Sequence, residues 1–122
     1  MDSLPPEVQR LIDDALTSMD HVEVLFRISR AGEATAEWLA RDAHIEQTQV
    51  MKVLRDLEHA KLIVHDGESY RVTQTARDRA AVDEFAGTYN ARPVTLIRAV
   101  YARPSPLRSF ADAFRLRREE DR

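Results

Sequence analysis

The stretch LIVHDGESYRVT, residues 62–73, decides the fold. Its two ends, 62–65 and 68–73, contain β-branched and aromatic residues, and the dipeptide Asp66-Gly67 separates them. Asp-Gly between two such runs is the strongest short-range indication of a β-hairpin. We therefore predict a two-stranded hairpin with Asp66 and Gly67 at its turn.

A helix-turn-helix is expected directly before the hairpin. Thr35 is suited to cap a two-turn helix that reaches Ala43. After the short stretch 42–45, a second helix begins near Glu46, and its apolar residues fall on one face: Val50, Val53, Leu54, Leu57 and Ala60. The short interval between the two helices indicates a helix-turn-helix.

Two more helices are expected before residue 35. Pro5 and Pro6 are suited to the first turn of a short helix. Asp20 and Glu23 have the spacing of a capping box for the next helix, and Gly32 is expected to end it. The sequence thus predicts that three helices precede the helix that begins near Glu46.

Helical patterns also follow the hairpin. Thr73 is expected to cap a helix that reaches about Tyr89, and residues 94–101 resume the helical pattern. Ser105-Pro106 predicts the start of a last amphipathic helix with the apolar residues Leu107, Phe110, Ala111 and Phe114. The predicted fold class is mainly α with a small β-hairpin.

The order of these elements resembles a winged helix-turn-helix, most nearly that of the MarR-like group of bacterial transcription regulators. The resemblance covers residues 35–73 and lies in Leu39-Ala40, Ile45, Val50, Leu54, Leu57, Leu62-Ile63, Asp66-Gly67 and Val72-Thr73. Together with the helical patterns on both sides, the predicted architecture is a winged helix-turn-helix with additional N- and C-terminal helices. The resemblance implies that it binds duplex DNA as a dimer. A small-molecule pocket near Phe26, Tyr89 and Tyr101 is a further implication of the resemblance.

The expected organisation is an N-terminal helix (1–18), a winged helix-turn-helix domain (19–90), C-terminal helices (91–118) and a tail (119–122). The terminal helices carry more apolar surface than a three-helix core requires, which favours a homodimer. Packing of these helices on their own core is the alternative. Trp38 lies opposite the apolar face of its helix, and we expect the N-terminal helix to cover it, with a ligand as the alternative.

One face of the helix that begins near Glu46 carries no acidic residue. Amides can pair with adenine in the major groove, while Lys and Arg meet guanine or phosphates. We therefore predict that this helix contacts DNA, helped by one residue of the hairpin: Gln47, Thr48, Gln49, Met51, Lys52, Arg55, His59 and Arg71. The alternative is an ordinary solvated helix face that carries a few cations by chance.

Charge weighs against tight DNA binding. The net charge is −3, and the tip of the hairpin carries the carboxylates of Asp66 and Glu68, which phosphates would repel. Lys61 stands where such motifs commonly have glycine, so the preceding helix lacks an easy left-handed cap. A different function is therefore a second hypothesis: a winged-helix adaptor that binds a protein of the transcription or signalling machinery instead of DNA.

The positive charge lies late in the chain. Residues 1–72 hold 8 basic and 14 acidic side chains, whereas residues 73–122 hold 10 basic and 7 acidic ones, and all ten cations there are arginines. Arginine suits carboxylate or phosphate partners. We expect these arginines to pair with the acidic first part of the chain, either within one chain or across a dimer. Extra contacts to DNA are the alternative.

Catalysis is not expected. The chain has no cysteine, no glycine-rich phosphate loop and no histidines at metal-ligand spacing, so we predict no enzyme, no cofactor and no metal. It also has no secretory signal and no apolar run long enough to cross a bilayer, which favours a cytoplasmic protein.

Overall fold

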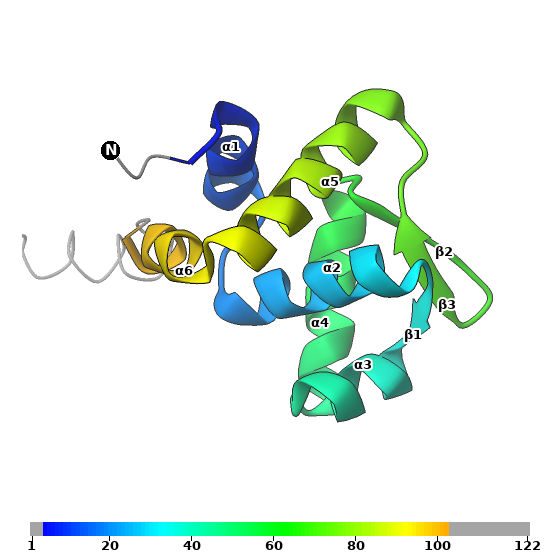
Figure 1. Cartoon of the computed structure of the whole chain (residues 1–122). Coiled ribbons are helices and arrows are strands. Elements are labelled where there is room, and N and C mark those ends of the chain that lie inside the picture. Colours follow the sequence, from blue (N-terminus) through cyan, green and yellow to red (C-terminus); the bar gives the residue numbers. More distant parts are fainter. Residues whose placement is uncertain (1–3, 103–122) are drawn as a thin grey trace, which may run out of the picture.

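The computed structural model describes residues 4–102, which fold into six helices and a small three-stranded sheet (Figure 1). The elements in chain order are α1 (Pro6–Asp14), α2 (Met19–Ala31), β1 (Ala34–Thr35), α3 (Ala36–Ala43), α4 (Gln47–His59), β2 (Ile63–Asp66), β3 (Ser69–Val72), α5 (Ala76–Ala91) and α6 (Pro93–Ala102). This order confirms a mainly α winged helix-turn-helix with additional helices on both sides. The helix expected from Ser105 lies outside the described residues.

The sheet corrects the predicted hairpin in two respects. Asp66 pairs with Ser69, so the turn consists of Gly67 and Glu68, one residue later than predicted. Gly67 has φ +66°, and a glycine with positive φ suits the first of two hairpin-turn positions. The sheet also has a third strand, β1, beside β3. At two residues, β1 is too short to show an alternating sequence pattern.

The start of α2 also differs from the prediction. Ser18, not the expected pair of Asp20 and Glu23, caps this helix, because its side chain accepts a hydrogen bond from the backbone N–H of His21. Ser18 has the extended backbone that an N-cap requires, whereas Asp20 already lies in the first turn. The end of α2 is as predicted, since Gly32 follows it with φ +87°.

Threonine capping is confirmed at one of two predicted positions. Thr35 caps α3 by accepting a hydrogen bond from the backbone N–H of Trp38 at 3.1 Å. Thr73 does not cap α5, which begins three residues later at Ala76. Its backbone N–H instead donates to the carbonyl of Leu62 at 3.0 Å, which holds Thr73 at the end of the sheet.

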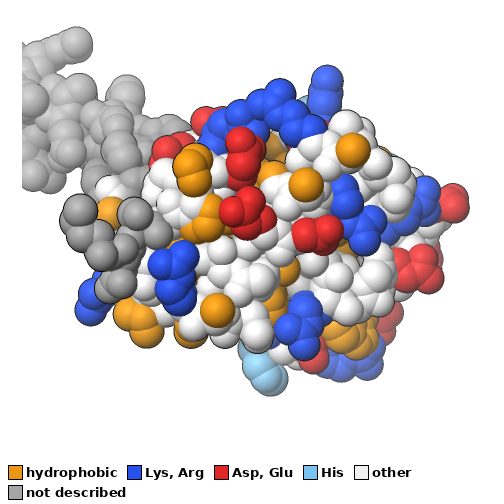
Figure 2. Space-filling model, turned by 45° about the horizontal axis from the view of Figure 1, so that its top comes forward, with side chains coloured by type: hydrophobic (Ala, Val, Ile, Leu, Met, Phe, Trp, Pro, Cys, Tyr) orange, Lys and Arg blue, Asp and Glu red, His pale blue; other side chains and the backbone are white. Residues whose placement is uncertain are grey.

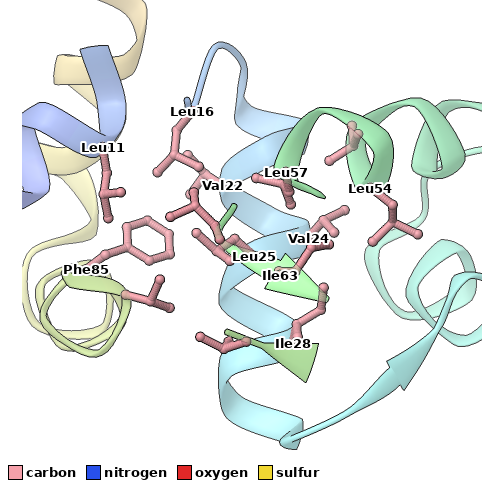
Figure 3. Packing of buried hydrophobic residues seen from close by; sticks show 14 of the residues in the cluster. Leu11, Leu16, Val22, Val24, Leu25, Ile28, Leu54, Leu57, Ile63 and Phe85 are labelled. Carbon is pink, nitrogen blue, oxygen red and sulfur yellow. The ribbon is translucent and has the colours of Figure 1, made fainter. Parts of the chain in front are cut away.

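A single hydrophobic core joins all six helices of the described part of the chain, and α2 lies at its centre. Figure 3 shows Phe85 of α5 beside Leu11 of α1 and Val22 of α2, while Leu54 and Leu57 of α4 approach α2 from the other side. Burying a side chain of this size contributes about 2 kcal/mol. The core therefore anchors one face of α4 and leaves the opposite face to solvent.

Helix α1 packs against α5 and α6, at the end of the molecule away from α3 (Figure 1). It does not cover Trp38 of α3, which is 38% exposed, so the expectation for this tryptophan was wrong. The physical reason is that α1 packs its buried face, formed by Val8, Leu11 and Ile12, against α5 and α6. Within residues 4–102, no helix has the length and apolar character to span a bilayer.

Candidate nucleic-acid interface

Helix α4 presents a polar face. Its buried residues, Val50, Val53, Leu54 and Leu57, face the core. The opposite side exposes six of the seven residues predicted on this helix: Gln47, Thr48, Met51, Lys52, Arg55 and His59. Gln49 is the exception, since it is partly buried. The structure thus gathers these six side chains on one surface.

Two neighbouring residues of α2 hold α4 in place. The amide of Gln49 donates a hydrogen bond to Asp20 at 3.2 Å, so Gln49 is engaged within the protein. Nε2 of His21 lies 2.9 Å from a carboxylate oxygen of Asp56, and its Nδ1 lies 2.7 Å from the hydroxyl of Ser18. His21 is only 6% exposed. No local sequence pattern indicated these pairs, because 29 and 35 residues separate their members.

The two acidic residues within α4 are both bonded to histidines outside the helix. Asp56 meets His21 of α2, and Glu58 lies 2.7 Å from Nδ1 of His65 on β2. An ionised carboxylate only accepts hydrogen bonds, so each histidine N–H donates. Asp56 nevertheless remains exposed, and Glu58 lines the same depression as Met51 and Arg55, so the prediction that no acid lies on this face is wrong for Glu58.

The wing, β2 and β3 with their turn, places its residues on two sides. Tyr70 faces α4, where it lines depressions together with Met51. Arg71, the next residue, lines a different depression, with Ile28 of α2 and Arg79 of α5. Successive strand residues point to opposite faces. The structure thus separates Arg71 from the predicted residues of α4 and brings in Tyr70, which sequence reasoning missed.

Two depressions lie between α4 and the sheet. One, of about 260 Å³, is lined by Met51, Arg55, Glu58, His59 and Tyr70. The other, of about 300 Å³, is lined by Thr35, Ala36, Glu37, Gln47, Met51, Gly67, Glu68 and Tyr70. The first depression holds opposite charges, Arg55 and Glu58, whereas the acids Glu37 and Glu68 make the second unfavourable for an anion.

A larger depression of about 630 Å³ lies between α2, α3 and α5. Phe26 and Tyr89 meet there edge to face at 5.0 Å, and the guanidinium of Arg30 lies 5.6 Å from the Phe26 ring. Phe26 and Tyr89 thus lie together beside this depression, and a small-molecule pocket here stays a prediction. Tyr101 does not line this depression; it lies on α6 and is 64% exposed.

A polar network links α2, α3 and α5 beside this depression. Arg27 of α2 donates hydrogen bonds to Glu23 and, at 2.8 Å, to Asp42 of α3. Burial lowers the pKa of Arg27, but these bonds outweigh burial and raise it. The hydroxyl of Tyr89 on α5 donates to Glu23 at 2.6 Å, and burial together with this bond raises the pKa of Tyr89 to about 12.

Charge is mixed on the face that Figure 2 shows, where acidic and basic side chains are interspersed and hydrophobic ones form small separate patches. In the part of the chain that the structure describes, no three side chains of the metal-binding types gather closely enough to hold an ion.

Comparison with known proteins gives one structural match and no match in sequence. No protein-family model matches the chain, and no curated protein matches it. The fold is similar to the crystal structure of a MarR family protein from Mycobacterium tuberculosis, with a TM-score of 0.53 and 26% sequence identity. The similarity covers 80% of this chain and 66% of that protein, slightly under two thirds of its length. The resemblance to the MarR-like group is therefore confirmed at the level of the fold.

Proposed function

We propose that this protein is a sequence-specific DNA-binding transcription regulator of the bacterial type, which acts as a homodimer and places α4 in the major groove. One observation carries the proposal: α4 exposes amide, hydroxyl and cationic side chains, while both acids within it are bonded to histidines. The similarity to a MarR family protein supports it.

Each residue of the face has a proposed role. Arg55 and Lys52 meet guanine edges or phosphates, and the amide of Gln47 pairs with adenine. Thr48 and His59 donate to bases or phosphates near the two ends of the helix. Gln49, held by Asp20, fixes the orientation of α4. Arg71 lies on the face of the wing opposite to Tyr70, and its contact with DNA stays a prediction.

Fluorescence anisotropy tests this proposal, with a duplex selected from a random-sequence pool. Lys52→Ala and Arg55→Ala should each weaken binding, by about tenfold if a bidentate contact to guanine is lost. If a phosphate contact is lost, the slope of log affinity against log salt concentration should also become shallower by about one released ion.

Arg77→Ala is the matched control, because Arg77 is exposed on α5, which packs against α1, α2 and α6. Its binding should equal that of the parent. The proposal is wrong if both α4 variants bind like the parent, or if the parent selects no duplex at low salt.

A second function, a winged-helix adaptor for another protein, is favoured by the acidic tip of the wing. Asp66 and Glu68 are exposed there, and phosphates would repel them. Reversing both charges to lysine separates the two functions. A DNA-binding protein should then bind its duplex more tightly at low salt, whereas an adaptor should lose capture of a partner from the transcription or signalling machinery.

A further inference from the structure

Met51 is exposed on the side of the polar face of α4 that lies toward the sheet. Its side chain is 41% exposed, although it is apolar. Thr48, three residues earlier, and Arg55, four residues later, are its exposed neighbours along the helix. An uncharged thioether thus lies on the surface proposed to meet DNA, beside hydroxyl and cationic groups, with Glu58 on its sheet side.

Tyr70 supports Met51 from the side of the wing. The two residues line both depressions between α4 and the sheet, so they separate a depression with Arg55 and Glu58 from one with Glu37 and Glu68. Tyr70 is itself held in the middle of the sheet, where it pairs with Ala34 of β1 and His65 of β2.

The chemistry of Met51 fits one group in the major groove. Bases present hydrogen-bonding atoms there, and the only methyl group among the four is the C5-methyl of thymine. Methionine cannot donate a hydrogen bond, but its flexible, polarisable side chain adapts to small apolar groups. We propose that Met51 is a specificity-determining residue that contacts a thymine methyl, an inference that rests on the proposed entry of α4 into the major groove.

Uracil substitution tests this contact without altering the protein. A duplex selected from a random-sequence pool is resynthesised with deoxyuridine at one thymidine position at a time, symmetry-related half-site positions being changed together. At one such position, loss of the methyl should weaken binding to each half-site about fourfold, the factor that corresponds to one buried methyl-sized group. Deoxy-5-bromouridine there should restore the affinity, because bromine is similar in size to a methyl group.

The variant Met51→Ala, tested on the thymine and the uracil duplex, forms a double-mutant cycle with the base substitution. Its affinity should no longer depend on the methyl, so the thymine and uracil duplexes bind equally. Lys52→Ala is the matched control: it should weaken both duplexes and keep the fourfold difference between them. Circular dichroism should show both variants folded, since Met51 and Lys52 are exposed.

The outcomes separate this inference from the proposed function. The inference is overturned if no thymine position is sensitive to uracil, or if Met51→Ala is as sensitive as the parent. In both cases the parent still binds its thymine duplex, so the proposed function stands. If the parent binds no duplex even at low salt, both fail together.

Discussion

Lys61 shows how a single residue can take on a role that glycine usually fills. It ends α4 with φ +64°, in the left-handed region. Its N–H donates to the carbonyl of Glu58 at 2.9 Å, and that of Leu62 donates to Leu57 at 3.1 Å, the pair of bonds of a Schellman motif. The helix therefore ends in the motif that glycine usually forms, with Lys61 in a strained backbone conformation in place of glycine.

Replacement of Lys61 by glycine should stabilise the protein by about 1 kcal/mol, since glycine has no Cβ to oppose a positive φ. Urea denaturation at neutral pH measures the change. Lys61→Ala removes the amine but keeps the Cβ, so its stability should match that of the parent. Equal stability of the glycine and alanine variants would show that the strain is negligible.

Tyr89 should make the protein sensitive to alkali. Its pKa is raised to about 12 by burial and by its bond to Glu23, against an ordinary value near 10. The fold therefore favours the protonated phenol, and this contribution is complete below about pH 10 and is lost as the pH rises through about 12. Tyr89→Phe should have a shallower loss of stability over that interval.

Denaturant unfolding at a series of pH values between about 9 and 12 measures this slope. Tyr101→Phe is the control, because Tyr101 is exposed on α6. Its slope should follow that of the parent. A Tyr89→Phe variant with the parental slope would contradict the assignment.

At the scale of elements, α4 depends on the first turn of α2. His21 joins the hydroxyl of Ser18 to the carboxylate of Asp56, and its ring is buried. His21→Ala should destabilise the fold by about 2 kcal/mol, because it removes two hydrogen bonds and leaves space in the core. The free energy of unfolding in urea gives the value.

His59→Ala is the control for this prediction. His59 is exposed on α4, so its removal should change stability by less than about 0.5 kcal/mol. If the two variants are equally stable, the bond between α2 and α4 contributes nothing to the fold.

At the scale of the whole molecule, apolar surface is left on α6. Val94 is 59% exposed, and a depression of about 530 Å³ between α1 and α6 is lined by Leu4, Pro6, Gln9, Thr95, Arg98, Ala99 and Ala102. We predict that a second copy of the chain covers this surface in a homodimer, by burial of the same patch on each protomer.

Sedimentation equilibrium at tens of micromolar should give the mass of a dimer for the parent. Val94→Asp should shift the equilibrium toward monomer, since a charge in the interface would be desolvated. Val64→Asp makes the same change at an exposed position of the wing and should leave the dimer intact. A monomeric parent would refute the prediction.

The sequence alone determined those features of the fold that depend on local interactions. The helices, the Thr35 cap, the end of α2 at Gly32 and the hairpin follow from residues within a few positions of one another. Helical spacing also identified six exposed residues of α4, because one buried face defines the opposite one, and failed only for Gln49 at the border.

Only the tertiary structure decided how these elements meet. The strand β1, the bond of Asp20 to Gln49 and the approach of Tyr70 to Met51 all join segments far apart in the chain. The separation of Arg71 from α4 depends on which sheet face packs against which helix. Such contacts are set by burial of a shared core and by strand register, which no local pattern of residues contains.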